Sequence, residues 1–203
     1  MELSYRAKTK LKAWQKEGSV TLANGFGKEF RETIFRNPTT GDVQKFILFG
    51  QRDWSVILPI TKDGKVVTVR QYKQGCNKIY IDLPAGTADF KDENPQVVAE
   101  RELLEETGYE SSEVVLLGPP MWIASRNSWT RFWPFVALGC EKVQPAKIDE
   151  NEEIETLLFP LDEWFGFCQN ELEDHSAHVA TFRALPHIKR HLPDVNLSQM
   201  LGI

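Results

Sequence analysis

The sequence predicts an α+β protein, in which a layered α/β/α domain follows a β-rich N-terminal segment. Stretches in which apolar and polar residues alternate, as is typical of strands, lie before and after one central helix-forming stretch. More helix-forming residues lie near the C-terminus. Hydrophobic residues make up 41% of the 203 residues, which is enough for one substantial core. We therefore divide the chain into a β-rich segment (1–50), a main domain (51–190) and a tail (191–203).

Turn residues mark two predicted hairpins. Residues 29–50 alternate on both sides of the turn sequence NPTTG, which favours a hairpin with a longer turn. The second hairpin has a tight turn at Lys62-Asp63-Gly64, between strands expected at 54–60 and 65–72.

The later elements are predicted from local patterns of the same kind. Further strands are expected at residues 78–84, 113–118, 131–139 and 154–160. Helices are expected at residues 161–170 and 176–185, after which Pro186 and Pro193 should break up the tail.

The central helix is predicted to run from residue 95 to residue 107. Asn94 followed by Pro95 is a typical helix start, and Gly108 is a typical helix stop. Steps of about 100° per residue place three glutamates within one arc of this helix, with Val97, Leu103 and Leu104 on the side expected to face the sheet. The three glutamates are Glu102, Glu105 and Glu106.

This acidic arc suggests a metal site. Carboxylates three and four residues apart repel one another, and the helix dipole disfavours negative charge at a C-terminal end. A divalent cation would remove both objections, and oxygen ligands suit Mg²⁺ or Mn²⁺ better than zinc. The alternative is a solvated acidic face without a ligand.

Composition and charge narrow the function classes. The net charge is −5 without a basic run, so neither a nucleic acid nor a membrane is expected as a partner. The three cysteines match neither a zinc spacing nor a disulfide framework, which favours a reducing cytoplasm. The N-terminus lacks the apolar stretch of a secretory signal.

The stretch LPAGTADFKDENPQVVAERELLEETGY resembles the signature motif of the Nudix family, the Nudix box. The matching residues are Gly86, Glu93, Arg101, Glu102, Leu103, Glu105, Glu106 and Gly108, with Tyr109 in the last, aliphatic place. Six residues separate Gly86 from Glu93, one more than the family pattern. Asp92 as the first acid would restore that spacing but would leave eight residues before Arg101, so Glu93 is preferred.

The resemblance implies a Nudix-type α/β/α sandwich with a mixed sheet, and Mg²⁺-dependent hydrolysis of a nucleoside diphosphate linked to another moiety. It implies that Glu102, Glu105 and Glu106 hold the metal together with the backbone carbonyl of Ala85, and that Glu106 belongs to the catalytic set. Gly86, Glu93, Arg101 and Gly108 would be structural, with Arg101 paired to Glu93.

Two further stretches resemble the ADP-ribose and nucleoside diphosphate sugar hydrolases of this family. They are Arg70-Gln71-Tyr72-Lys73 and Asp82-Leu83-Pro84-Ala85-Gly86. Arg70 would meet a phosphate, and Asp82 would contact the base, although relatives carry the longer glutamate there. Ser125 also departs from the branch, since ADP-ribose hydrolases tend to have a proline at that place. ADP-ribose and other nucleoside diphosphate sugars therefore remain open as substrates.

The resemblance also places a catalytic base and further substrate contacts. In these relatives an acidic loop supplies the base that activates water, and residues 148–160 resemble that loop. The match implies that Glu150 is the base, with Glu152 or Glu153 as the alternative. Phe30, or else Phe26 or Trp54, would stack on the nucleobase, and Arg126 or Arg131 would hold a distal phosphate or sugar. In these relatives the N-terminal β-segment is exchanged across a homodimer, so a homodimer is expected.

Two alternatives to a nucleotide-sugar hydrolase stay open. One is hydrolysis of another phosphoanhydride, in a dinucleoside polyphosphate, a coenzyme A or an RNA 5′ end, although the low basic content disfavours RNA. The other is a binding module that holds a nucleotide sugar without cleaving it. Such a module is expected to lose the glutamates of the box, which this chain retains.

Overall fold

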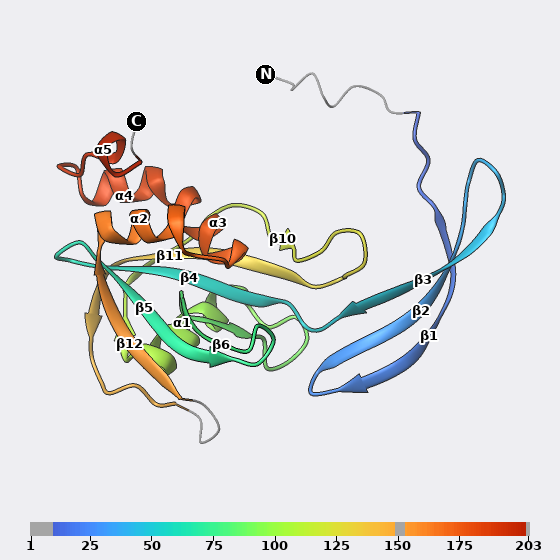
Figure 1. Ribbon diagram of the computed structural model, residues 1–203, viewed down its shortest axis with the longest axis horizontal. Coiled ribbons are helices and arrows are strands. Elements are labelled where there is room, and N and C mark those ends of the chain that lie inside the picture. The colour runs from blue at the N-terminus through green and yellow to red at the C-terminus, as the bar shows by residue number, and fades with distance from the viewer. Residues whose placement is uncertain (1–9, 149–152, 202–203) are drawn as a thin grey trace. The chain divides into compact units, whose positions relative to one another are not determined.

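Figure 1 shows a computed structural model of the chain, which describes residues 10–148 and 153–201. The described residues form two compact units. The first unit contains the residues up to Gln51 together with Trp122–Thr130, and the second contains Arg52–Met121 and the residues from Arg131 onward. Within the described residues, no helix is long and apolar enough to cross a membrane.

The first unit is built on a three-stranded antiparallel sheet in the order β1-β2-β3. Its strands are β1 (Gln15–Gly25), β2 (Lys28–Arg36) and β3 (Val43–Gly50). The predicted hairpin at 29–50 is confirmed as β2 and β3, joined by a turn in which the Gly41 N–H donates to the Asn37 carbonyl over 2.9 Å. Strand β1 lies in the segment predicted to be β-rich, but its bounds were not predicted from the sequence. All but one of its residues are exposed.

The second unit contains a mixed sheet with the strand order β10-β11-β4-β5-β12. Strand β11 runs parallel to β4, whereas β5 pairs antiparallel with both β4 and β12. These strands are β4 (Trp54–Thr61), β5 (Lys65–Lys73), β10 (Met121–Trp122), β11 (Arg131–Lys142) and β12 (Ile154–Pro160). Four short strands pair with the internal strands: β6 (Lys78–Asp82) with β5, β7 (Ala85–Thr87) with β4, and both β8 (Tyr109–Glu110) and β9 (Glu113–Leu116) with β11.

Helices cover both faces of this sheet. Figure 1 shows α1 on one face and α2, α3 and α4 on the other, and β4 between them is buried over nearly its whole length. The helices are α1 (Pro95–Thr107), α2 (Leu161–Asn170), α3 (His175–Arg183), α4 (Leu185–His191) and α5 (Leu197–Leu201). The break expected at Pro186 is present, since α3 ends at Arg183, but a further helix follows it. Pro186 lies in the first turn of α4, where its missing N–H costs nothing.

Helix α1 has the predicted bounds because its caps are encoded locally. The Asn94 side chain accepts a hydrogen bond of 2.9 Å from the Gln96 N–H. At the other end, Gly108 has a φ of 74°, and its N–H donates to the Leu104 carbonyl over 2.9 Å. A side chain at Gly108 would place its Cβ 2.0 Å from the Gln144 carbonyl oxygen, so only glycine fits here.

The buried stripe of α1 differs from the prediction at two of the three apolar positions, because Leu104 is only half-buried and Val97 is exposed. Val97 was expected to face the sheet, but it is 49% exposed. The buried stripe instead follows the spacing of Ala99, Leu103 and Glu106, in which each residue lies three or four places after the last. Leu103 and Ala99 join the core cluster with Ile57 and Phe135 of the sheet. The acidic arc is therefore rotated toward the sheet, and Glu106 is buried.

Candidate functional site

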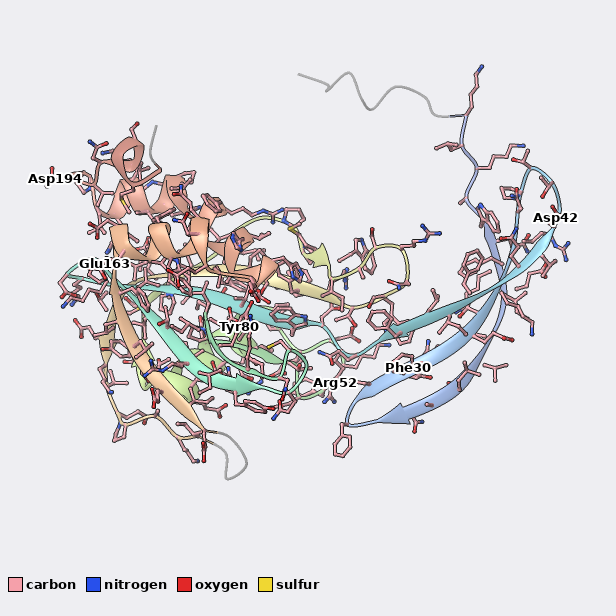
Figure 2. All side chains as sticks on the ribbon, viewed as in Figure 1. Phe30, Asp42, Arg52, Tyr80, Glu163 and Asp194 are labelled. Carbon is pink, nitrogen blue, oxygen red and sulfur yellow. The ribbon has the colours of Figure 1, made fainter. Side chains whose placement is uncertain are left out.

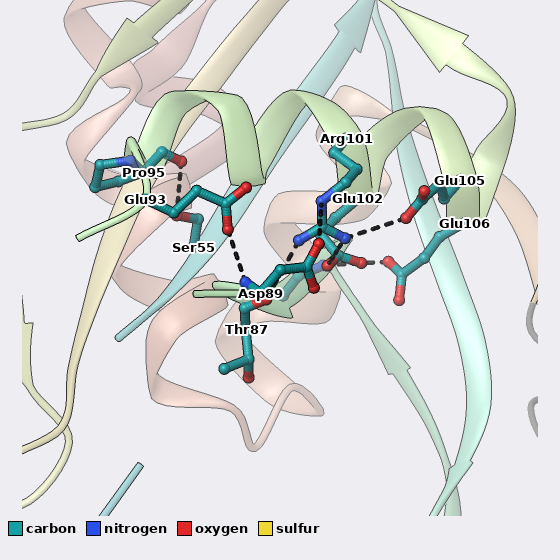
Figure 3. Close-up of polar contacts among 10 residues, drawn as sticks. Ser55, Thr87, Asp89, Glu93, Pro95, Arg101, Glu102, Glu105 and Glu106 are labelled. Atoms are coloured by element: carbon teal, nitrogen blue, oxygen red, sulfur yellow. Dashed lines mark hydrogen bonds and ion pairs between the residues drawn. The ribbon is translucent and has the colours of Figure 1, made fainter. Parts of the chain in front are cut away.

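The structure brings the Nudix box residues of β7 and α1 into direct contact (Figure 3). A Cβ at Gly86 would lie 1.9 Å from Oε1 of Glu102, so the absence of a side chain at this position makes room for the glutamate. The Ala85 N–H donates to Oε2 of Glu106 over 3.1 Å. Two of the predicted metal-binding glutamates are thus held against the turn that precedes the helix.

Arg101 holds two of the three glutamates of the acidic arc. Its Nη1 donates to Oε1 of Glu102 over 2.7 Å and to Oε2 of Glu105 over 3.2 Å. Its Nη2 donates to the Thr87 carbonyl over 3.3 Å, which ties the helix to β7. Partial burial lowers the pKa of Arg101, but the charges of Glu102 and Glu105 outweigh this effect and raise the pKa above its ordinary value.

The predicted pairing of Arg101 with Glu93 is not what the structure shows. Among the described residues, the ion-pair partners of Arg101 are Asp89, Glu102 and Glu105. Glu93 instead accepts a hydrogen bond of 2.7 Å from the Asp89 N–H. The additional residue in this loop explains the change, since Asp92 adopts a left-handed φ of 62° and the chain takes a different path to the helix.

The three glutamates have the donor chemistry that Mg²⁺ prefers, namely carboxylate oxygens on a rigid helix. In the described part of the chain, however, no three His, Cys, Asp or Glu side chains are arranged to hold a metal ion. Glu102 and Glu105 accept hydrogen bonds from Arg101, and Glu106 accepts one from the Ala85 N–H. The carboxylate oxygens of the three glutamates therefore fit a divalent cation when Arg101 gives up, or shares with the cation, its hydrogen bonds to Glu102 and Glu105.

Asp82 lies at the end of β6 and is only 8% exposed. Its Oδ1 accepts a hydrogen bond of 2.8 Å from the Leu83 N–H. Burial first, and then the negative charge of Asp174, raise the pKa of Asp82 from 3.8 to about 7. A carboxyl group so placed has little surface to offer a nucleobase.

Arg70 is paired across the sheet. It lies on β5 directly opposite Glu155 of β12, and its Nε donates to Oε2 of Glu155 over 2.8 Å. The Arg70 side chain keeps 43% of its surface exposed, so a phosphate has access to it.

Phe30 and Arg126 belong to the first unit, unlike the acidic arc. Phe30, labelled in Figure 2, is 48% exposed and stacks on Phe49 with ring centroids 6.0 Å apart. Arg126 lines a cavity of about 530 Å³ within this unit. The aromatic walls of this cavity are Trp14, Phe35, Phe46, Trp122 and Trp129. The sequence did not predict this cavity, because its walls come from segments as far apart in the chain as Trp14, Phe46 and Trp129.

Of the other residues predicted to contact the substrate, two pack or pair with neighbouring residues of the fold and one is exposed to solvent. Arg131 forms an ion pair of 2.8 Å with Asp53. Trp54 packs on Phe132 in the core, with ring centroids 5.3 Å apart. Phe26 is fully exposed in the turn between β1 and β2.

The candidate bases precede β12 in the sequence. Glu150 and Glu152 are outside the described residues, so the structure does not bear on them. Glu153 is exposed directly before β12.

Comparison with known proteins identifies the family. The family model of the NUDIX domain matches residues 51–184, more than half of the chain, and the chain therefore belongs to the Nudix family. A solved structure described as a crystal structure of ADP compounds hydrolase covers 91% of this chain and 99% of its own, with a TM-score of 0.76 and 18% identity. The predicted α+β class and the Nudix resemblance are confirmed.

Two curated relatives match parts of the chain. The methanol dehydrogenase activator of Bacillus methanolicus is 34% identical over 121 residues, which are 57% of this chain and 62% of that protein. The ADP-ribose pyrophosphatase of Bacillus subtilis (strain 168) is 36% identical over 58 residues, which are 29% of this chain and 31% of that protein. In both cases the chain matches less than two thirds of the relative's length.

The buried carboxyl group of Asp82 predicts a dependence of stability on pH. Its pKa is about 7 in the folded chain against an ordinary 3.8, so the folded chain binds one more proton between about pH 4 and pH 7. This group therefore makes the free energy of unfolding fall as the pH rises through that window, and adds no further change above it. Asp82→Asn keeps an acceptor for the Leu83 N–H and should raise the free energy of unfolding at pH 8 by about 2–4 kcal/mol. Urea denaturation of both proteins at pH 5 and pH 8 measures this; an equal pH dependence in the two would contradict it.

Proposed function

We propose that this Nudix protein is a Mg²⁺-dependent hydrolase that cleaves the pyrophosphate of a nucleoside diphosphate sugar such as ADP-ribose, releasing a nucleoside monophosphate and a sugar phosphate. The observation that carries this proposal is the acidic arc of α1, held against β7 through Gly86 and Ala85. The name of the Bacillus subtilis relative, an ADP-ribose pyrophosphatase, supports the substrate class. Mn²⁺ is expected to substitute for Mg²⁺, and the cytoplasm is the proposed location.

In this proposal Glu102, Glu105 and Glu106 hold the metal with the Ala85 carbonyl. A bound divalent cation would neutralise the pyrophosphate charge and lower the pKa of an attacking water. The protein's own part is positioning: the 13 residues of α1 form a rigid support, and Gly86 and Arg101 fix the carboxylates of Glu102 and Glu105 beside β7. Gly108 ends the helix two residues after Glu106, and Glu93 fixes the loop before the helix.

Substrate contacts come from residues outside the helix. Arg70 is proposed to meet a phosphate, for which its planar fork of N–H groups is suited, while still pairing with Glu155. Phe30 and Arg126 are proposed to contact the base and a distal group, with Asp82 retained as a weaker base contact. The burial of Asp82 favours one second candidate, hydrolysis of another phosphoanhydride whose recognition needs no carboxylate at this position.

A homodimer is part of the proposal. The sheet of the first unit leaves large apolar side chains exposed, and these would be covered by a second copy of the chain. They include Val20, Leu22, Phe30, Val43 and Ile47. Sedimentation velocity at micromolar concentration tests this point, because an active monomer would exclude a site that both copies share.

Replacing one metal-binding glutamate tests the proposed function. Glu106→Gln keeps a carbonyl oxygen to accept the Ala85 N–H, so the fold should persist, but the hydrolysis rate should fall by a factor on the order of 10³ or more. The matched control is Glu100→Gln, an exposed residue of the same helix that bonds only to Gln96 among the described residues. Release of nucleoside monophosphate from ADP-ribose measures both variants. Equal loss in the control, or wild-type turnover by Glu106→Gln, would remove Glu106 from the metal site.

The catalytic base is tested in the acidic loop before β12. We place it at Glu150, with Glu152 as the alternative, because residues 148–160 resemble the acidic stretch that supplies the base in the nucleoside diphosphate sugar hydrolases of this family. Glu150→Gln should lower kcat by a factor of about 10² or more while leaving metal affinity unchanged. Glu152→Gln is the comparison, under the same assay. Loss confined to Glu152→Gln would move the base by two residues, and two fully active variants would exclude this loop from water activation.

A further inference from the structure

The loop between β7 and α1 contains a carboxylate that the Nudix resemblance does not assign. Asp89 lies 3.7 Å, through its Oδ2, from Nε of Arg101. This Nε is buried and has no hydrogen-bond partner among the described residues. A buried N–H without an acceptor is costly, and Asp89 is the carboxylate beside it. Figure 3 shows Asp89 on the side of Arg101 that faces away from Glu105.

The backbone of Asp89 is fixed from both sides. Its N–H donates to Oε2 of Glu93 over 2.7 Å. Its carbonyl accepts a hydrogen bond of 2.6 Å from Nη1 of Arg52, which Figure 2 labels. Two side chains from different parts of the second unit therefore hold this residue in place, although its own side chain is 68% exposed. Only its carboxylate remains free to move toward the unsatisfied Nε of Arg101.

We infer that Asp89 is a positioning residue for the metal site: it competes with Glu102 and Glu105 for the guanidinium of Arg101. This inference rests on the metal site of the proposed function. Arg101 occupies an oxygen of each of the two glutamates, and those oxygens are the ones a divalent cation would need. By accepting the Nε–H, Asp89 draws Arg101 toward itself and leaves both glutamates freer to bind the cation.

Charge alone does not distinguish Asp89 from its neighbours, but contact does. Glu93 and Glu100 carry the same charge in the same region, and neither is among the described ion-pair partners of Arg101. Removing any of the three charges weakens the local attraction for cations to a similar small degree. Only the removal of Asp89 also returns Arg101 fully to the two glutamates.

The test is the affinity of the 203-residue chain for Mn²⁺, measured from free Mn²⁺ by electron paramagnetic resonance without substrate. Asp89→Asn should raise the Mn²⁺ Kd about three-fold, the size expected for an ion pair with one exposed partner. Glu93→Gln and Glu100→Gln should each raise it by less than about 1.5-fold. In an Arg101→Gln background, Asp89→Asn should have no further effect, because the competition has been removed. The melting temperature of Asp89→Asn in chelator should stay within about 2 °C of wild type.

The contrary outcomes separate the inference from the proposed function. Wild-type chain that binds no Mn²⁺ overturns the metal site and this inference with it. Wild-type binding with equal effects of Asp89→Asn and Glu93→Gln overturns the inference alone. An effect of Asp89→Asn that persists in Arg101→Gln, or that appears only with a lowered melting temperature, also overturns it, since charge or folding would then be the cause.

Discussion

The close approach of Glu102 to the backbone at Gly86 is the constraint on which the rest of the site depends. Any residue other than glycine at this position would place its Cβ 1.9 Å from Oε1 of Glu102. The turn and the helix therefore contact each other here through a carboxylate and not through apolar side chains. The Ala85 N–H then reaches Glu106 from the same turn. Because α1 is also held by the sheet core through Leu103, the acidic arc has a defined position against β7.

The three neighbouring carboxylates repel one another, and Arg101 offsets only part of this repulsion. Arg101 bridges Glu102 and Glu105 and is tied to β7 through Thr87, whereas Glu106 relies on a backbone N–H. Among the described residues, Arg101 pairs with Glu102 and Glu105, and a divalent cation would add the positive charge that three clustered carboxylates favour. The same guanidinium must therefore serve the fold and yield to the ligand. The loop before α1 contains Asp89, and in our inference this residue draws Arg101 away from the two glutamates when the cation binds.

Features encoded by neighbouring residues were predictable from the sequence, and features that depend on distant segments were not. Asn94, Pro95 and Gly108 define both ends of α1, and the turn at Lys62-Asp63-Gly64 defines the β4–β5 hairpin, because caps and turns involve only a few adjacent residues. The exposure of Val97 was missed because the sequence gives the spacing of a stripe but not the angle at which the helix meets its sheet.

The site residues divide in the same way. The box placed Gly86, Glu102 and Glu106 in one motif, and the structure brings Glu102 against Gly86 and Glu106 against the neighbouring Ala85. The partner of Arg101 was not predictable, because the inserted residue alters the loop path through a left-handed Asp92. The burial of Asp82 depends on neighbours that include Asp174, which lies more than ninety positions later in the chain.

The account's central claim, that the acidic arc of α1 supports metal-dependent cleavage of a phosphoanhydride, is tested most directly by following ADP-ribose with the wild-type chain by phosphorus NMR. The account predicts that the two coupled pyrophosphate resonances disappear in Mg²⁺ and are replaced by those of two phosphate monoesters, AMP and ribose 5-phosphate, while nothing changes in excess chelator. Equal cleavage with and without chelator would contradict the claim, as would intact ADP-ribose and intact nucleoside diphosphate sugars of every base in the presence of Mg²⁺.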